Sequence, residues 1–371
     1  MKVLFVCGSL EPGKDGVGDY IRLLSFTLIK RGIAVKVIAL NDKYISDCKK
    51  YIQTIEKIDI PSLRVSSKII AKEKNAKILE FIDDFNPSIV SIQYVPYAFN
   101  SKGLPFNLTK ELKHIIRDRK VHFMFHELWI GMEKGASLKN VFVGKLQRKI
   151  VSNLLKKLNP VLIHTHTEFY KYQLTFLTKN VSIEKLHLFG NIPVVEKGEH
   201  KDSSNNLNLV LFGSIHYQNS LDDFLKWILD FAYKNDQKVF FHFIGNNGAE
   251  LEAWVQLLKK NNVSYKVHGR KSVEYISKLF LKSQIGITTT PYFLVEKSGS
   301  VAAMLEHDLP VLCVARDWLP NVENFDVILP KINVIRFRKD LHYDLSQISN
   351  SKDFSLERIG DKFINSLNKH L

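Results

Sequence analysis

Short apolar runs alternate with segments of helical periodicity along this chain, and this alternation is the feature that most restricts its fold. In the first half, strand-like runs occur at 2–8, 34–40, 88–94, 121–125, 160–164 and 185–189. Helical patterns fall between several of them, at 17–30, 68–85, 139–157 and 168–177. Strands that are apolar along their whole length and alternate with helices are typical of parallel sheets covered on both faces. The first half is therefore predicted to be a doubly wound α/β domain.

The same alternation restarts after a polar, charged segment at 195–208. Strand-like runs recur at 209–213, 239–245, 265–268, 285–290 and 309–315, with helical patterns at 221–234, 249–260, 273–281 and 298–306. A length of 371 residues also favours about two domains. We expect an α/β fold of two Rossmann-like, doubly wound domains that face a central cleft. Their predicted extents are 1–195 and 208–350, with a linker at 196–207 and a C-terminal helical segment, 351–371, in a position to pack back on the N-terminal domain.

The composition limits the classes of partner. The formal net charge is +15, and a field of that sign attracts nucleic acid, anionic lipid or phosphorylated substrates. The basic residues are scattered and show neither zinc-finger spacing nor an aromatic RNA-binding pattern, so sequence-specific nucleic-acid binding is not expected. The sequence contains no apolar run of about 18 residues and no secretion signal at its start. We therefore expect a cytoplasmic protein.

The densest basic segment is the helical pattern at 139–157. Its apolar residues recur at three- and four-residue steps, and lysine and arginine fill much of the rest. One interpretation is a surface helix that packs one face on its own sheet. The other is a helix that lies on an anionic membrane, which would place the protein peripherally at the inner face of that membrane.

A second informative segment, 288–315, reads as strand, loop, helix and strand. The helix is expected to begin at Ser298-Gly299-Ser300 and to end at Glu306. The exposed amides at a helix start carry partial positive charge and can bind an anion, and Gly299 would let a phosphate approach the backbone. Glu306, two turns along, could accept hydrogen bonds from neighbouring sugar hydroxyls. The alternative is an ordinary buried crossover with a serine N-cap.

The cysteine and histidine patterns do not predict a metal site. The three cysteines, at positions 7, 48 and 313, lie far apart in the sequence, which favours reduced thiols. Four histidines, at 122, 126, 164 and 166, fall on two strand-like runs, and the last two would share a sheet face. No carboxylate or cysteine completes a recognisable ligand set around them.

Three motifs together resemble GT-B glycosyltransferases, most closely the retaining family called GT4. The first is the glycine-bearing turn that opens a helix, Gly13 to Tyr20, and the second is the strand-ending pair His126-Glu127. The third and most specific runs from Ser298-Gly299 through Glu306 to Asp308-Leu309-Pro310-Val311. The resemblance covers nearly the whole chain in the order and spacing of its elements.

The resemblance implies roles for particular residues. His126 would face the sugar near its reacting carbon, where an imidazole can orient a hydroxyl or accept a proton. Lys297 is not assigned by the family pattern, but from its place just before the helix start it is expected to stabilise charge on the leaving phosphate. The residues expected to bind the nucleotide sugar are Gly16, Val17, Gly213, Ser214, Arg270, Ser298, Gly299, Ser300, Val301 and Glu306. No metal or other cofactor is expected.

The sequence departs from the family pattern at three positions. Family members usually carry glutamate where this chain has Ser298. Their arginine and lysine beside the donor diphosphate correspond to Ser214 and Asn219. The changes at 214 and 219 remove two cations that would stabilise a departing nucleoside diphosphate. Lys297, or else Arg270 and Lys271, could supply the missing charge.

The function implied by the resemblance is transfer of a sugar, of the hexosyl type and with retention, from a nucleotide-sugar donor. The acceptor would be a glycan, a lipid-linked molecule or a protein, in bacterial surface glycoconjugate synthesis. One alternative, suggested by Ser214, Asn219 and Ser298, is a noncatalytic GT-B protein that binds glycans or a partner. Another is a dinucleotide-dependent enzyme, because Gly13, Gly16 and Gly18 loosely resemble a Rossmann turn. The nucleotide base, sugar, acceptor and oligomeric state are not readable from the sequence.

Overall fold

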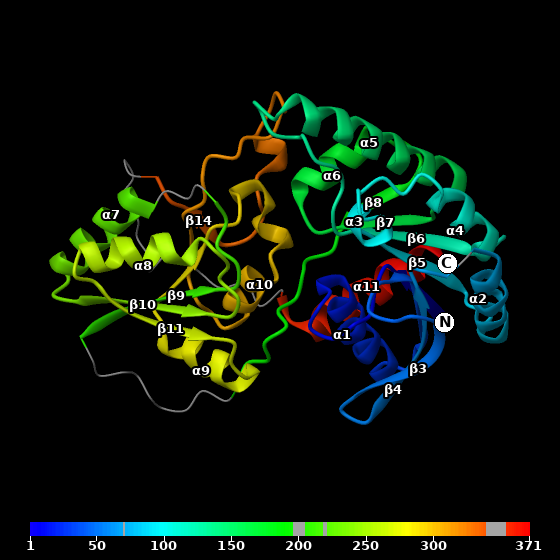
Figure 1. The fold of residues 1–371 in the computed structure, drawn as a ribbon, viewed down its shortest axis with the longest axis horizontal. Helices are drawn as coiled ribbons and strands as arrows, with labels where there is room; N and C mark the ends of the chain where they lie inside the picture. Colours follow the sequence, from blue (N-terminus) through cyan, green and yellow to red (C-terminus); the bar gives the residue numbers. More distant parts are fainter. Residues whose placement is uncertain (70, 196–204, 218–220, 339–353) are drawn as a thin grey trace. The chain divides into compact units, whose positions relative to one another are not determined.

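A computed structural model of the chain describes residues 1–69, 71–195, 205–217, 221–338 and 354–371 (Figure 1). The chain divides into two compact units. The first contains Met1–Leu186, Asn321–Glu323 and Leu356–Leu371, and the second contains His187–Pro320 and Asn324–Ser355. Of the expected linker, 196–204 lies outside the described residues, and its last two residues begin a strand of the second unit.

An eight-stranded sheet forms the first unit, in the order β3-β4-β2-β1-β5-β6-β7-β8. The described strand pairings are parallel except for that of β3 with β4. The strands are β1 (Lys2–Cys7), β2 (Ala34–Asp42), β3 (Cys48–Ile55), β4 (Ile58–Ser66), β5 (Ile89–Tyr94), β6 (Lys120–Phe125), β7 (Leu162–Thr165) and β8 (Ser182–Lys185). The central strands are buried on both faces, β5 along its whole length, because helices cover the sheet on each side.

The helices of this unit are α1 (Gly16–Lys30), α2 (Ala71–Phe85), α3 (Pro96–Phe99), α4 (Leu108–Ile116), α5 (Leu138–Leu158), α6 (Glu168–Thr175) and α11 (Leu356–His370). The C-terminal helix α11 packs against α1, and Gly360 permits the close approach because a Cβ there would lie 2.6 Å from Thr27. Phe363 on α11 stacks on Phe5 of β1. In Figure 1, α5 lies on the opposite side of strands β5 to β7 from α1 and α11.

The structure corrects two details of the sequence interpretation in this unit. The polar stretch between the strand-like run at 34–40 and the helical pattern at 68–85, where no element was predicted, contains the hairpin β3–β4, whose turn residues Glu56 and Lys57 have positive φ of 46° and 70°. Those residues are not the Asn or Gly that usually mark such a turn, and β3 is mostly exposed, so the pattern was weak. The strand expected at 185–189 instead spans Ser182–Lys185. Leu186 and Phe189 are apolar because the connecting segment is buried.

The second unit contains a six-stranded parallel sheet in the order β11-β10-β9-β12-β13-β14. Its strands are β9 (Asn206–Phe212), β10 (Lys238–Ile244), β11 (Ser264–Gly269), β12 (Ile285–Thr288), β13 (Val311–Cys313) and β14 (Val334–Arg336). Sequence analysis missed β14, which has only three residues. The remaining elements are α7 (Leu221–Lys234), α8 (Leu251–Lys260), α9 (Val273–Lys282), η1 (Tyr292–Lys297), α10 (Gly299–Glu306) and η2 (Asp326–Ile328). Two Rossmann-like sheets, parallel except for the β3–β4 pairing, confirm the predicted α/β fold class.

Two apolar clusters hold the second sheet between its helices. One joins α7 and α8 to the sheet through residues such as Phe224, Trp254 and Phe241. The other joins α9 and α10 to the opposite face through Phe280, Met304 and neighbouring residues. The chain runs outward from β9 to β11 and returns to the other side of β9 at β12. Loops on the two sides of this reversal leave in opposite directions, and a reversal of this kind is where open parallel sheets usually bind their ligands.

Candidate functional site

The reversal point of the second sheet brings the loop after β9 to the start of α10. Gly213 follows β9 with φ of 85°, and its amide donates to Ile244 O at 3.0 Å. Asn247 holds the same turn, because its Nδ2 donates to Gly213 O at 2.8 Å. A Cβ on Gly213 would lie 3.7 Å from the side chain of Ser300. Two residues predicted to bind the nucleotide sugar, Gly213 and Ser300, are therefore neighbours.

Serine hydroxyls surround the beginning of α10. Ser298 is the N-cap, and its Oγ accepts from the Val301 amide at 3.4 Å. Ser298 Oγ also lies 3.0 Å from Ser300 Oγ and 3.5 Å from Thr290 Oγ1. The amide of Val301 is thus engaged by the cap. The amides of Gly299 and Ser300 are the first two of the helix and point out of its end.

The surroundings of this helix start favour an anion. The first turn of α10 contains no acidic residue, and a Cβ on Gly299 would approach only the Leu188 side chain, at 4.0 Å. Lys297, half-buried at the end of η1, carries positive charge one residue before the N-cap. A phosphate at this helix start would therefore meet backbone amides and hydroxyls, with Lys297 one residue before the N-cap.

Sequence reasoning gave no role to His216, which lies in the loop after β9. Its amide donates to Thr289 Oγ1 at 2.8 Å, which ties this loop to the end of β12. Burial, and then the positive charge of Lys297, lower the pKa of the His216 ring. Lys297 therefore lies close enough to the loop after β9 for its charge to act on the His216 ring. The only sequence signal was the position of His216 within the Gly213 to Asn219 segment; residues 218–220, including Asn219, lie outside the described residues.

Glu306 is the last residue of α10. The segment between β8 and β9 passes close to this end of the helix at Gly190. A Cβ on Gly190 would lie 2.8 Å from Ala303 Cα and would clash with the Glu306 carboxylate. Only glycine therefore fits between this segment and the helix.

Ser214 is exposed in the loop after β9, and Arg270 is exposed after edge strand β11, about two strand spacings or 10 Å from β9.

In the first unit, the glycine turn leads into α1, and the charges around the start of this helix differ from those around the start of α10. Asp15 caps the helix, because its side chain accepts from the Gly18 amide at 2.7 Å. Asp19 in the first turn accepts from the Gly13 amide at 3.0 Å. Gly16 has open space around it, and Val17 follows it in the first turn. Two carboxylates already offset the positive end of α1, which makes it a weaker anion site than α10.

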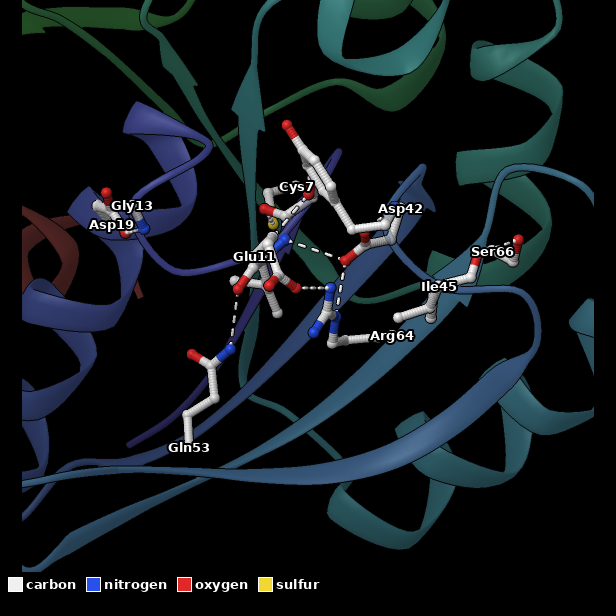
Figure 2. A network of polar contacts seen from close by, with 12 residues as sticks. Cys7, Glu11, Gly13, Asp19, Asp42, Ile45, Gln53, Arg64 and Ser66 are labelled. Atoms are coloured by element: carbon white, nitrogen blue, oxygen red, sulfur yellow. Dashed lines mark hydrogen bonds and ion pairs between the residues drawn. The ribbon is translucent and has the colours of Figure 1, made fainter. Parts of the chain in front are cut away.

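A buried polar network anchors the glycine turn, as Figure 2 shows. Arg64 on β4 donates to Asp42 Oδ2 at 2.8 Å and to Glu11 Oε2 at 2.6 Å. Asp42 accepts from the Leu10 amide at 3.2 Å, and Gln53 on β3 donates to Leu10 O at 3.0 Å. The hairpin that sequence analysis missed therefore fixes the residues that precede the turn.

His126 lies at the end of β6 and is buried. Its Nε2 is 2.9 Å from Gln93 Oε1, and its Nδ1 is 3.0 Å from His166 Nε2. Tyr20 on α1 packs edge-on against the ring at a centroid distance of 4.9 Å. Both ring nitrogens thus contact side chains of the same unit. The sequence had predicted His126 as a sugar contact but had not shown this network. The part of the chain that the structure describes contains no group of three His, Cys, Asp or Glu residues arranged to hold a metal.

Comparison with known proteins supports the fold. No protein-family model matches the chain, and no curated protein matches it. Among solved structures, HepE of Anabaena in complex with UDP and glucose is similar over 100% of both chains, with 13% identity and a TM-score of 0.61. The apo lipopolysaccharide outer core galactosyltransferase WaaB matches over 100% of both chains, with 14% identity and a TM-score of 0.57.

The similar structures are not restricted to glycosyltransferases. A putative UDP-N-acetylglucosamine 2-epimerase from Listeria monocytogenes has 14% identity and a TM-score of 0.54, over 100% of this chain and 96% of the other. At such low identity, likeness shows the fold alone. The chain thus has the two-domain GT-B fold, which these glycosyltransferases and this epimerase share.

Proposed function

We propose that the chain is a retaining glycosyltransferase of the GT4 type, which moves a hexosyl group from a nucleotide-sugar donor to an acceptor hydroxyl. The observation that carries the proposal is the convergence of Gly213, Ser300 and the start of α10 at the reversal point of a parallel sheet. In support, the similar protein HepE has been solved with UDP and with UDP-glucose.

The donor diphosphate would lie at the start of α10. The amides of Gly299 and Ser300 would donate to its oxygens, and the hydroxyls of Ser298 and Ser300 would add two further donors. Lys297 would offset the negative charge that develops on the leaving nucleoside diphosphate. In this role Lys297 replaces the arginine and lysine that the family has at the positions of Ser214 and Asn219. The protein would then supply the positive charge without a metal ion.

Glu306 would bind the nucleoside part of the donor. A carboxylate accepts two hydrogen bonds from adjacent donors such as the ribose hydroxyls. Gly190 holds the connecting segment against the same helix face, so it would fix the position of that carboxylate. Arg270 would lie at the margin of the donor site.

In the first unit, the glycine turn with Gly16 and Val17 would approach the acceptor rather than the diphosphate, because Asp15 and Asp19 oppose an anion there. His126 would contact the transferred sugar. Gln93 and His166 hold its two ring nitrogens, so a sugar hydroxyl would exchange with one of these contacts.

The acceptor is proposed to be a glycan, lipid-linked or protein molecule of a bacterial surface glycoconjugate, met at an anionic membrane. The exposed face of α5 supports this location. Leu138 and Phe142 near its start are 88% and 64% exposed, beside lysines at 139, 145 and 149. Apolar tips within a basic surface suit the boundary of an anionic bilayer. No helix among the described residues is long and apolar enough to cross a membrane.

The test of the activity is product analysis. The protein would be incubated with UDP-, GDP- and ADP-sugars, alone and with candidate acceptors, in buffer that contains a chelator. Release of a nucleoside diphosphate, with the product sugar in the anomeric configuration of the donor, would support the proposal. Inverted configuration or an absolute requirement for a metal would contradict its mechanism. Conversion of a nucleotide sugar into its C2 epimer would show that the protein is an epimerase and would contradict the proposed transferase activity.

A further inference from the structure

The strand order of the first sheet also reverses, at β1. The chain runs outward from β1 to β2 and returns on the other side of β1 at β5. Open parallel sheets usually bind ligands at such a reversal, beyond the carboxyl ends of the two strands. The short helix α3 follows β5 directly and therefore lies at this place.

Contacts from three strand ends fix α3 in position. A Cβ on Gly8, which follows β1, would lie 2.5 Å from Ala98 O, so only glycine permits this approach. Asn41 of β2 donates from its Nδ2 to the same oxygen at 2.9 Å. Phe99 stacks on Tyr94, the last residue of β5, at a centroid distance of 6.1 Å. A ligand at α3 would therefore meet a preformed surface.

Tyr97 is the residue of α3 that faces solvent, and it is 44% exposed. Its ring packs against Gly103, because a Cβ at that position would lie 2.7 Å from Tyr97 Cε1 and 2.8 Å from Cζ. Gly103 is buried and has φ of 69°. The ring is thus supported by backbone where it is covered. A tyrosine held in this way offers a large contact area at little cost in conformational entropy.

Gln147 of α5 supports Gly103 from inside the unit. This side chain is fully buried. Its Nε2 donates to Gly103 O at 3.1 Å, and its Oε1 accepts from the Ile130 amide at 2.9 Å. Because both partners are backbone groups of fixed character, the orientation of the side-chain amide is determined. One buried amide therefore ties the loop behind Tyr97 to the loop after β6.

A hydrogen-bond donor lies beside the ring. Asn100 is three residues after Tyr97, on the same side of the helical turn. Its Oδ1 accepts from the amides of Lys102 at 2.9 Å and Leu104 at 3.2 Å. These two bonds fix the plane of the Asn100 amide. Its Nδ2 has no acceptor among the described residues, so it can donate to a ligand.

The combination of an exposed ring and a fixed amide suits a sugar. A pyranose carries C–H groups on its faces and hydroxyls around its rim. The C–H groups pack on the negative face of an aromatic ring, and a hydroxyl accepts from an amide. Side chains that enter lipid protrude, as Leu138 and Phe142 do at 88% and 64% exposure. Tyr97 instead packs on backbone beside a polar group, which favours a sugar over a lipid chain.

We propose that Tyr97 and Asn100 form a sugar-binding site at the strand reversal of the first sheet, with Gln147 as its positioning residue. The ligand is a hexopyranose ring of a glycan, stacked on Tyr97. That this ring belongs to the acceptor rests on the proposed function. The binding itself rests only on the geometry of the first unit.

Binding of simple glycosides to the full chain tests the site. The probes are the methyl glycosides of glucose, galactose, mannose and N-acetylglucosamine, titrated while carbon-13 NMR follows labelled tyrosine rings. Tyr97→Phe removes one signal and thereby identifies that of Tyr97. We expect at least one glycoside to shift this signal saturably, with a dissociation constant of about 1–10 mM for a ligand of this size. Absence of a saturable shift with all four would overturn the proposal.

Tyr97→Ala should weaken binding of that glycoside by about tenfold, as measured by saturation-transfer NMR, whereas Tyr97→Phe keeps the ring and most of the affinity. Tyr51→Ala is the matched control, because Tyr51 on β3 is also 44% exposed. It should bind the glycoside as the unaltered protein does. Equal affinity in Tyr97→Ala and the control would overturn the site.

Gln147→Met keeps the side-chain volume but removes both hydrogen bonds. It should weaken glycoside binding several-fold, although Gln147 is fully buried and cannot touch the ligand, and should leave nucleotide affinity unchanged. Unchanged glycoside affinity, or an equal loss of nucleotide affinity, would overturn the positioning role.

A second arm addresses the link to transfer. If transfer is detected, Tyr97→Ala should raise the KM of the acceptor by about tenfold without changing the KM of the donor. An unchanged acceptor KM would show that the bound sugar is not the acceptor. Saturable glycoside binding without any transfer would count against the proposed function and not against the sugar site.

Discussion

Ser300 faces Gly213 where the second sheet reverses its strand order, and a side chain at position 213 would meet it at 3.7 Å. This relationship joins the loop after β9 to the start of α10. Glycine stands at position 213 because its φ of 85° is a backbone conformation that residues with a side chain rarely adopt.

Lys297→Met is expected to lower kcat by about 10²- to 10³-fold, because it removes the cation proposed to stabilise the leaving diphosphate. Lys297→Arg should retain most of the activity. Lys260→Met, at the exposed end of α8, is the matched control and should leave turnover unchanged. Equal turnover in Lys297→Met and the control would exclude Lys297 from the reaction.

Gly190→Ala is expected to weaken nucleotide binding by displacing the Glu306 carboxylate, which a Cβ at position 190 would overlap. Isothermal titration of the bound nucleotide measures the effect in a double-mutant cycle with Glu306→Ala. If Gly190 acts through Glu306, its substitution should cost little further affinity in the Glu306→Ala background. Fully additive losses would show that the two positions act separately.

Arg64→Met should destabilise the first unit by about 3 kcal/mol, because it leaves the fully buried Asp42 without its ion-pair partner. Urea unfolding measures the change. Arg31→Met, which breaks the exposed pair with Asp361, serves as the control and should have little effect. Equal losses in the two variants would show that the buried network does not hold the glycine turn more firmly than a surface pair does.

Acid is expected to destabilise the second unit through His242. Burial, and then His268, lower its pKa from 6.5 to about 4. Between about pH 6.5 and about pH 4 the unfolded chain therefore binds more protons at this position, and the free energy of unfolding falls as the pH falls. His242→Gln should reduce that slope, by less than about 1.4 kcal/mol per pH unit because the ring is partly solvated. An unchanged slope in urea unfolding across this range would contradict the assignment.

The exposed end of α5 should contribute to membrane contact. The protein is expected to sediment with acidic liposomes at low salt, and less so as salt screens the lysines. Leu138→Ser combined with Phe142→Ser should reduce the bound fraction several-fold while Tyr233→Ser, another strongly exposed residue in the second unit, leaves it unchanged. Equal sedimentation of neutral and acidic liposomes would contradict an electrostatic contact.

The sequence predicted the sheets because their central strands are apolar without interruption, a pattern that depends only on burial. It missed β3 and β4, because β3 is exposed along most of its length and the turn at Glu56 and Lys57 lacks its usual residues. It also missed β14, because three residues carry too little pattern.

The candidate site was predictable only where a residue type has its own chemistry. Gly299 and Glu306 could be assigned roles from a helix pattern and its ends. His216 could not, because its relation to Thr289 and Lys297 depends on two loops distant in sequence. The contacts among the buried histidines of the first sheet likewise depend on strand register. The sequence placed His164 and His166 on one face, but the order of contacts through Gln93 and Ser91 follows only from the paired strands.

Titration of the purified protein with UDP, GDP and ADP, each alone and as common sugar conjugates, tests the central claim most directly. We predict that one nucleoside diphosphate and its conjugates bind, and that Glu306→Ala weakens this binding at least tenfold while leaving the melting temperature of the free protein nearly unchanged. Binding of nicotinamide dinucleotides in their place, or equal nucleotide affinity in the Glu306→Ala variant, would contradict a donor site at the start of α10.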